Sequence, residues 1–390
     1  MNTRDASASP WPPCAEKAAV TTRPVTLVQL VPPGPGGVRD FASLLQERWL
    51  ESGRHSALLA LNPAEAATQP WQHQPGPWAV LLHYSGYGYQ ARGVPWALLQ
   101  WLRRLRKDKG DELRLVSYFH ESFASGPPWG SAFWLSGLQS RIGRHVAQAS
   151  DAVCTNTQAH AAWLASGPGL PGAEPLYVQP VFAAVDEPLH PPGSWAERKP
   201  TAVVLGAAST RARVLQACAD KAALLHSHGI ESLVEVGPGP SAVPAGGAGL
   251  PLHFQGRLEK LELHALLRTC RAGLIDYPAS LLAKSSVFAA LAAHGVPVLN
   301  TRPFDENADG LQVNHHYLGL PAAPGSAARW LSDPVEWHAV AQAAAHWYAP
   351  HGSRQQAAQL LALLQPRSTV EAGLSGNPPP LLSAIPQEET

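Results

Sequence analysis

The chain has 390 residues, more than one typical domain needs, and 45% of them are hydrophobic, enough for a sizeable core. Its 29 Lys and Arg side chains balance 29 Asp and Glu, so the formal net charge at pH 7 is +0. This balance excludes a strongly polybasic protein of the kind that binds nucleic acid or anionic membranes, although a local basic patch is compatible with it. With 33 glycines and 38 prolines the chain is rich in turns, and its length predicts two domains.

The four cysteines are widely separated and show neither a Cys-x-x-Cys pair nor a zinc-type spacing (Cys14, Cys154, Cys218 and Cys270). We therefore expect reduced thiols and a cytoplasmic protein. The first residues are polar and lack the apolar stretch of a signal peptide. No apolar run reaches the roughly 18 residues that a membrane span requires, so at most peripheral membrane contact is expected.

The first part of the chain alternates between short apolar runs and amphipathic segments. Residues 1–23 lack hydrophobic periodicity and are expected to form a disordered arm, after which a first domain extends over 24–187. The run Val25–Val31 predicts a buried strand, and the apolar face of residues 38–49 predicts a helix. Further strands are expected at 56–61, 78–83, 113–119 and 151–156, and a further helix at 95–106.

A second series follows a Pro-rich linker at 188–200, forms a domain over 201–365 and leaves a flexible tail at 366–390. Strands are expected at 201–206, 232–236, 272–277 and 296–300, and helices at 211–228, 258–270, 286–294 and within 327–364. Such alternation predicts parallel sheets built from βαβ units. The fold class is therefore α/β, with two facing Rossmann-like domains and a cleft between them. Ligands of such sheets bind at the carboxyl ends of the strands.

A glycine-rich loop joins the first predicted strand to the first helix, in the sequence Gly34-Pro-Gly36-Gly37-Val-Arg39. Its spacing is neither a dinucleotide-binding fingerprint nor a P-loop. Gly36 and Gly37 allow the backbone to approach a ligand beside a helix N-terminus, which favours an anion such as phosphate. A tight turn that needs glycine for its dihedral angles explains the same residues.

Two histidines stand at the ends of predicted strands, His83 in Leu-Leu-His-Tyr and His120 in Tyr-Phe-His-Glu. A histidine in this place can exchange a hydrogen bond or a proton with a bound ligand. Glu121 follows directly and can orient the imidazole or bind a hydroxyl. His120 and Glu121 are therefore candidate catalytic residues, and a purely structural histidine is the alternative.

The segment after His83 interleaves three tyrosines with glycines and ends near Arg92. Aromatic rings on a flexible backbone suit the flat face of a sugar. We therefore expect His83, Tyr84, Tyr87 and Arg92 to bind a sugar or another ring-shaped ligand. Aromatic side chains that simply close a loop over the sheet explain this composition equally well.

The clearest candidate for a phosphate site is the segment 276–286, which leads into an Ala-rich helix. Ser285 or Ser286 can cap this helix, and Lys284 places a cation beside its N-terminus. A lysine at a helix N-terminus favours phosphate, and an ordinary capped helix with an exposed lysine is the alternative. Arg211, one of two arginines beside small polar residues, is a second phosphate candidate, with a surface arginine of a helix as the alternative.

Five segments carry a resemblance to a known family: the loop 35–41, the run Phe119-His120-Glu121, and the segments 149–157, 254–278 and 292–298. Together they resemble the GT-B glycosyltransferases, closest to family 4, over roughly residues 25–300. The resemblance implies transfer of a sugar from a nucleotide-diphosphate sugar. It also implies that the Gly-rich loop lies near the donor phosphates and the strand-end histidine near the transferred sugar.

One feature of that family is missing. The family commonly carries two glutamates eight positions apart around the donor helix, and counting back from Gly295 places Leu282 and Ala290 there. Neither side chain can bind a hydroxyl. Donor binding is therefore either rebuilt, with Lys284, Ser285 and Ser286 as candidates, or lost.

These observations predict a glycosyltransferase that transfers a sugar to an acceptor hydroxyl in polysaccharide or glycoconjugate synthesis. The donor is expected on the second domain, at Arg211, Lys284, Ser285 and Ser286. A carbohydrate or lipid-linked acceptor is expected on the first domain, at His83, Tyr84, Tyr87 and Arg92. No cofactor besides the donor, no metal ion and no nucleic-acid partner are expected. A catalytically silent GT-B protein that binds or scaffolds is the alternative, and a sugar-nucleotide epimerase is a third hypothesis.

Overall fold

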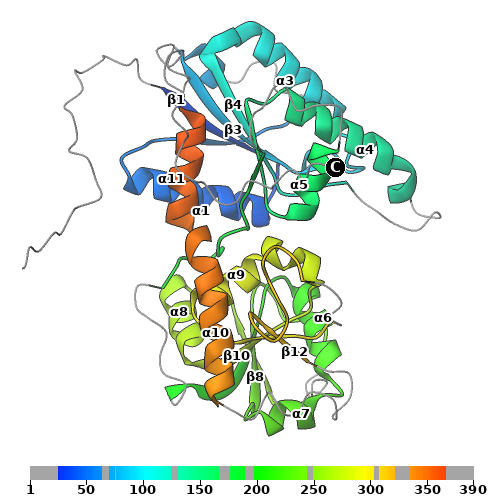
Figure 1. Cartoon of the computed structure of the whole chain (residues 1–390), viewed down its shortest axis with the longest axis vertical. Helices are drawn as coiled ribbons and strands as arrows, with labels where there is room; N and C mark the ends of the chain where they lie inside the picture. Colours follow the sequence, from blue (N-terminus) through cyan, green and yellow to red (C-terminus); the bar gives the residue numbers. More distant parts are fainter. Residues whose placement is uncertain are drawn as a thin grey trace, which may run out of the picture.

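The computed structural model of the chain consists of two α/β halves, one above the other in Figure 1. The structure describes residues 25–63, 70–74, 76–123, 131–166, 176–188, 197–243, 249–302, 307–320 and 334–365. The arm expected at 1–23, the tail at 366–390 and most of the linker, residues 189–196, lie outside the described residues. Two separate parallel sheets confirm the expected fold class.

The first half contains a six-stranded parallel sheet. In spatial order its strands are β2 (Ala57–Ala60), β1 (Thr26–Val31), β3 (Trp78–Tyr84), β4 (Leu113–Phe119), β5 (Ala152–Thr155) and β6 (Leu176–Val178). Every residue of β3 is buried, because helices cover both faces of the sheet and a parallel strand then needs a continuous apolar run. The strand order reverses between β1 and β3, so a crevice opens outside their carboxyl ends.

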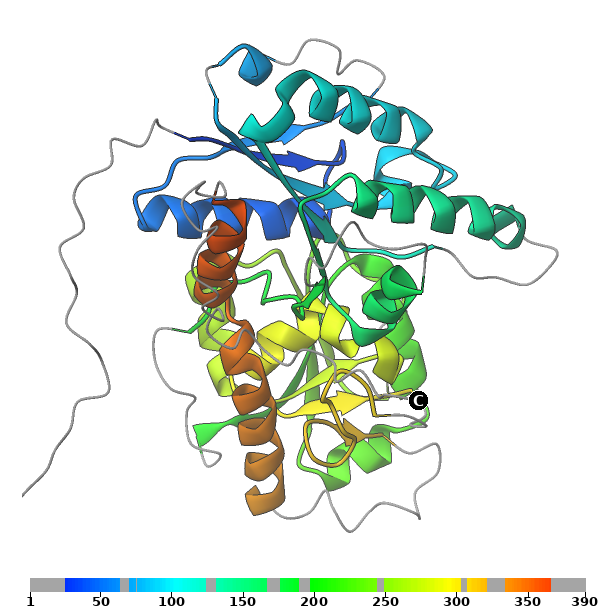
Figure 2. The same cartoon turned by 45° about the horizontal axis from the view of Figure 1, so that its top comes forward.

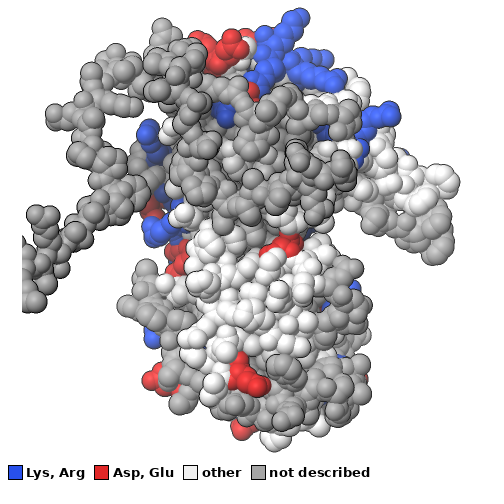
Figure 3. All heavy atoms as spheres, viewed as in Figure 1, with Lys and Arg blue, Asp and Glu red and all other residues white. Residues whose placement is uncertain are grey.

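The helices of this half pack on the sheet through apolar stripes. They are α1 (Gly37–Glu51), α2 (Gly86–Tyr89), α3 (Trp96–Lys109), α4 (Ser131–Gln148) and α5 (Gln158–Ala165), with short 3-10 turns at Pro70–His73 and Gly110–Glu112. In α1 the buried side chains include Phe41, Leu45 and Trp49, which recur at helical spacing. This confirms the helix expected at 38–49. The outer face of α3 exposes Arg103, Arg104 and Lys107. Figure 3 shows basic side chains gathered over the top of this half, so the charges of the chain are unevenly distributed over its surface although their sum is zero.

The second half repeats the architecture. Its parallel strands are, in order, β12 (Leu318–Gly319), β11 (Val298–Asn300), β10 (Cys270–Ile275), β7 (Lys199–Leu205), β8 (Ser232–Val236) and β9 (Leu252–Gly256). The order reverses between β7 and β10. Ligands of doubly wound sheets bind at such a point, here at the loops that follow these two strands.

The helices of the second half are α6 (Ala208–Cys218), α7 (Ala222–Ser227), α8 (Lys260–Thr269) and α9 (Ser286–Ala293), with a 3-10 turn η5 (Ala279–Lys284) before α9. The single helix expected at 211–228 is wrong. The chain turns between α6 and α7, and the turn lets Leu215 of α6 and Leu225 of α7 enter the same buried cluster.

The last two helices connect the halves. Helix α10 (Pro334–Tyr348) packs on α9, a short turn η6 (Ala349–His351) follows, and α11 (Ser353–Leu364) lies against α1 of the first half. Figures 1 and 2 show this orange-to-red pair running along both halves. The Trp49 indole nitrogen donates to the Ala357 carbonyl at 2.9 Å, which fixes α11 to α1.

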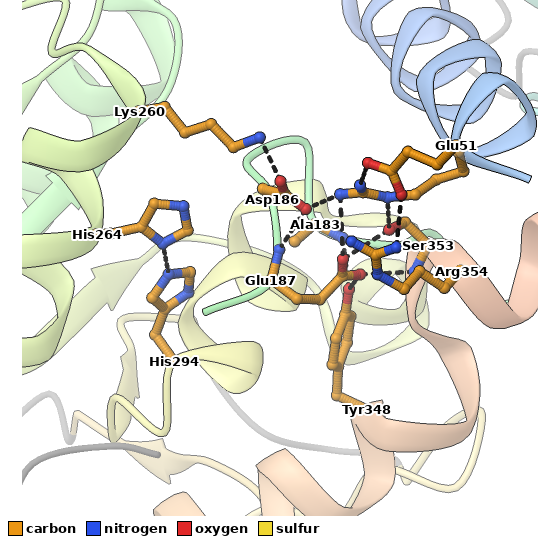
Figure 4. A network of polar contacts seen from close by, with 11 residues as sticks. Glu51, Ala183, Asp186, Glu187, Lys260, His264, His294, Tyr348, Ser353 and Arg354 are labelled. Atoms are coloured by element: carbon orange, nitrogen blue, oxygen red, sulfur yellow. Dashed lines mark hydrogen bonds and ion pairs between the residues drawn. The ribbon is translucent and has the colours of Figure 1, made fainter. Parts of the chain in front are cut away.

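A polar network strengthens this connection (Figure 4). Asp186, in the segment that leaves the first sheet, forms ion pairs with Arg48 of α1 and Lys260 of α8. Arg48 also donates from Nε to the Ser353 hydroxyl at 2.9 Å. Side chains from both halves and from α11 therefore meet at one point of the connecting segment.

Two further expectations can be compared with the structure. Cys154, Cys218 and Cys270 are buried free thiols, as expected, and Cys14 lies outside the described residues. No helix within the described ranges is both long and apolar enough to cross a membrane.

Candidate active site

A cavity of about 210 Å³ lies between the two halves, at the carboxyl ends of strands from both sheets. Its polar lining consists of Gly37, His120, Glu121 and Asn156 from the first half and Lys284 and Ser286 from the second. Phe41 and Phe182 form an apolar wall, with their rings stacked at 4.0 Å between centroids. The structure thus brings together five residues that the sequence singled out from segments far apart in the chain.

Two helix N-termini meet this cavity. Helix α1 begins at Gly37 without a side-chain cap, and Gly36, which precedes it, has φ 147°, a region that favours glycine. A Cβ at Gly36 or Gly37 would meet no atom within 4 Å, so the space before this helix is open. Helix α9 begins at Ser286, after the expected cap: the Ser285 hydroxyl accepts from the Phe288 N–H at 3.1 Å. Positive ends of two helix dipoles therefore line one site.

Lys284 and Glu121 give the cavity one charge of each sign. Burial lowers the pKa of Lys284 from its ordinary value, and the Glu121 carboxylate opposes part of this effect. Glu121 is held in place by Ser85, whose hydroxyl donates to Oε2 at 2.6 Å. A half-buried cation beside the α9 N-terminus is suited to bind a phosphate oxygen.

His120 is fixed at the end of β4 by both backbone and side chain. Its N–H donates to the Tyr84 carbonyl at 3.0 Å, and its own carbonyl accepts from the Asn156 amide at 3.2 Å. Its Nε2 lies 3.0 Å from Nδ1 of His83. Burial lowers the pKa of His120 well below its ordinary value, and the charges of His83, Lys284 and His160 add smaller effects in the same direction. The ring is therefore neutral at pH 7.

No protein-family model and no curated protein sequence matches the chain. Among solved structures, an alpha-glucosyltransferase in complex with UDP and a 13-mer DNA superimposes with a TM-score of 0.53 at 9% identity, covering 87% of this chain and 100% of that one. A trehalose 6-phosphate synthase from Burkholderia multivorans has a TM-score of 0.48 at 14% identity, covering 85% of this chain and 76% of that one. The first likeness extends over both halves. The fold is GT-B. At 9% identity the likeness shows the fold alone.

Arg211 does not reach the cavity of this GT-B fold. Its guanidinium is fully buried, with Nε 2.8 Å from a Glu235 carboxylate oxygen. It also donates to the carbonyls of Gly206, Pro238 and Gly239. The expected contact of Arg211 with the donor phosphates is therefore corrected: its donors are used inside the fold, where they join the loops after β7 and β8 at the carboxyl edge of the second sheet.

The residues expected to bind the acceptor do not line the cavity either. His83 and Tyr84 are buried, and the Tyr84 ring packs on Phe119 at 4.6 Å. Tyr87 and Arg92 lie on the loop after β3, where the Gln139 amide donates to the Tyr87 hydroxyl at 3.0 Å and to the Arg92 carbonyl at 2.8 Å. His83 lies behind the cavity wall, where its ring contacts His120 and Phe41. Tyr84 ends β3 in the core, and Tyr87 and Arg92 belong to the neighbouring loop.

Two polar groups at strand ends lie in segments that the sequence singled out, but neither was named there as a site residue. Asn156 follows β5 and lines the cavity, with an Oδ1 atom that no described residue bonds. Asp276 follows β10 and accepts from Arg302 at 3.0 Å, and Arg213 lies 3.5 Å away. A polar residue directly after a buried strand was the available signal for both.

The two positions at which the resemblance would place glutamates hold apolar side chains. Leu282 lies in η5 and Ala290 in α9, and both are buried. Across the described ranges, no group of three or more His, Cys, Asp or Glu side chains is arranged to hold a metal ion.

Proposed function

We propose that this chain is a glycosyltransferase that moves a sugar from a nucleotide-diphosphate sugar to an acceptor hydroxyl. The observation that carries the proposal is the meeting, in one cavity between the halves, of Lys284 and the α9 N-terminus with His120 and Glu121. Lys284 and the helix N-terminus suit a diphosphate, and His120 and Glu121 suit hydroxyls. The GT-B fold supports the proposal, because one enzyme of similar fold holds UDP and is an alpha-glucosyltransferase.

The proposed donor binds mainly to the second half, with its diphosphate at the α9 N-terminus. When the sugar leaves, negative charge develops on the diphosphate, and Lys284 and the backbone N–H groups of α9 stabilise it. His120 and Glu121 contact the sugar or the reacting hydroxyl from the first half. The Phe41 and Phe182 rings exclude water on one side, which strengthens these interactions.

The finer assignments are part of the same proposal. The segments 35–41, 119–121, 149–157, 254–278 and 292–298 favour a family 4 type of enzyme. The balanced charge disfavours a nucleic-acid acceptor, and we propose a carbohydrate or lipid-linked acceptor in polysaccharide or glycoconjugate synthesis in the cytoplasm. Because Lys284 and two helix N-termini supply positive character, we propose that transfer needs no metal ion and no further cofactor. Activity that EDTA abolishes and Mg²⁺ or Mn²⁺ restores would contradict this part.

The decisive experiment is a panel of nucleotides and nucleotide sugars. Calorimetry with UDP, GDP and a set of UDP-, GDP-, ADP- and dTDP-sugars measures binding, and release of free nucleotide from the sugars measures turnover. Binding of a nucleotide sugar with slow donor hydrolysis supports a transferase. Absence of binding across UDP-, GDP-, ADP- and dTDP-sugars contradicts the proposal.

Binding without turnover supports the second candidate, a silent GT-B protein that binds or scaffolds. A specific observation favours that candidate: hydrocarbon side chains, Leu282 and Ala290, occupy the positions of the family's paired glutamates. Transfer to an acceptor in the presence of a bound donor excludes it.

A further inference from the structure

A line of hydrogen bonds runs from the edge of the first sheet to the cavity. Gln29 lies within β1, His83 in β3 and His120 directly after β4. The Gln29 Nε2 atom donates to the Ser56 hydroxyl at 3.4 Å, and its Oε1 lies 3.0 Å from His83 Nε2. His83 Nδ1 in turn lies 3.0 Å from His120 Nε2. Gln29 and His83 are fully buried, and neither touches the cavity.

The order of donors and acceptors along this line is determined by its first member. An amide oxygen only accepts, so His83 carries its hydrogen on Nε2. Burial lowers the pKa of His83 to about 3, so the ring is neutral at pH 7 and its Nδ1 is a bare lone pair. That lone pair accepts from Nε2–H of His120. His120 is also neutral and therefore has no hydrogen on Nδ1.

The remaining nitrogen of His120 is the one available to a ligand. His120 lines the cavity, and no described residue bonds its Nδ1. The neighbouring Phe41 ring meets the imidazole edge to face at 5.1 Å and holds its plane. The cavity thus presents a hydrogen-bond acceptor here, where the opposite tautomer would present a donor.

We infer that Gln29 and His83 are positioning residues that hold His120 with its Nδ1 lone pair toward the cavity, so that this point accepts a hydrogen bond from a ligand hydroxyl. A carbonyl, carboxylate or phosphate oxygen has no hydrogen to donate and is disfavoured here. That this hydroxyl belongs to the transferred sugar rests on the proposed function. The tautomer of His120 is inferred from the hydrogen bonds and does not depend on that function.

The first test reads the tautomer directly in the full chain without ligand. Long-range ¹H–¹⁵N NMR of ¹⁵N-histidine protein at pH 7 distinguishes protonated from bare ring nitrogens, and loss of signals in His83→Gln and His120→Gln assigns them. We expect both rings to be protonated on Nε2 and bare on Nδ1. A His120 ring protonated on Nδ1 overturns the inference.

A variant tests whether Gln29 is responsible. Gln29→Met keeps the length of the side chain and removes the acceptor, so His120 should become a mixture of tautomers. The matched control is Gln139→Met, which removes a similarly buried amide that bonds Tyr87 and not the histidines. Circular dichroism confirms that each variant is folded. A His120 tautomer unchanged in folded Gln29→Met shows that Gln29 does not position it.

The second test reads hydroxyl selection. UDP-glucose is compared with its analogues in which fluorine replaces one hydroxyl at a time, because fluorine cannot donate a hydrogen bond. One analogue should bind about 10-fold more weakly, the effect of one lost hydrogen bond, and Gln29→Met should reduce that ratio to about 3-fold. Equal ratios in both proteins contradict the inference. If no nucleotide sugar binds, the proposed function fails, and the NMR result still decides the positioning.

Discussion

Glu187 binds Ser353 through both oxygens of its carboxylate. Its Oε1 accepts from the Ser353 backbone N–H at 2.6 Å, and its Oε2 accepts from the Ser353 hydroxyl at 2.6 Å. The Tyr348 hydroxyl adds a third hydrogen bond, to Oε1, at 2.7 Å. Burial alone would raise the pKa of Glu187, and the bonds from Ser353 and Tyr348 outweigh it and hold the pKa below its ordinary value. The acidic group therefore joins the connecting segment to the N-terminus of α11 (Figure 4).

Glu187→Gln should lower the free energy of unfolding by about 2–3 kcal/mol, because a neutral amide replaces a carboxylate that accepts three hydrogen bonds. Urea unfolding at pH 7 measures the loss. The comparison variant is Glu51→Gln, since Glu51 is partly exposed and pairs with Arg48 and with the exposed Arg354 but makes no bond to Ser353. Because the Glu51 carboxylate is exposed to solvent, neutralising it should cost about 1 kcal/mol or less. Equal losses in the two variants would show that the Glu187 bonds do not carry this junction.

Arg211→Met should destabilise the second half by about 3–5 kcal/mol, since it leaves the buried Glu235 carboxylate without its cation. Adding Glu235→Gln should restore part of the lost stability, because the neutral amide needs no cation. Its oxygen can still accept from the Ser241 N–H, which lies 2.7 Å from the Glu235 carboxylate in the structure. Urea unfolding should show that the double variant is more stable than Arg211→Met alone and less stable than the unchanged protein. If Arg211→Met folds with unchanged stability but binds UDP more weakly, Arg211 contacts the donor and this prediction is wrong.

Lys284→Met should weaken UDP binding about 10- to 100-fold without changing the fold, because it removes the cation beside the α9 N-terminus. Lys221→Met is the control, because Lys221 pairs with Asp220 outside the cavity lining. Calorimetry measures both affinities. Unchanged UDP affinity in Lys284→Met would place the diphosphate elsewhere.

The same lysine predicts a dependence of UDP affinity on alkaline pH. Burial lowers the pKa of Lys284, so the free protein loses this cation at a lower pH than an exposed lysine does. UDP affinity should fall as pH rises toward 10. Lys284→Arg should remove that fall, since a guanidinium stays charged over the whole range. An identical alkaline fall in both proteins would assign it to another group.

Much of the fold could be predicted because strands and helix ends are local features. His120, Glu121 and Lys284 were found in this way, at the ends of apolar runs. Arg211 was misplaced because its burial depends on Glu235, a residue of another strand. Gln29 was overlooked because one polar residue within the apolar run of β1 does not change the pattern that predicts a buried strand. Helix α4 was missed because it exposes Phe133 and Trp134, so its apolar residues do not follow its buried face.

The contact of α11 with α1 could not be inferred from the pattern of either helix. The bond from Trp49 to Ala357 joins residues 308 positions apart, and an amphipathic helix shows that it has a buried face without showing what covers it. Sequence reasoning therefore grouped α11 with the second half, whereas it packs on the first.

Mild acid should destabilise the protein through histidines that fold in the neutral state. Burial lowers the pKa of His83 to about 3 and those of His160 and His294 to about 4, against 6.5 for an ordinary histidine. Between pH 6.5 and about 4 the unfolded chain therefore binds protons that the folded chain does not, and stability falls as pH falls. Each histidine contributes a slope of up to about 1.4 kcal/mol per pH unit. Urea unfolding at pH 7.0, 6.0 and 5.0 should show this loss above the range in which carboxylates titrate. A free energy of unfolding that stays constant from pH 7.0 to 5.0 would mean that these rings take up protons in the folded protein as readily as in the unfolded chain.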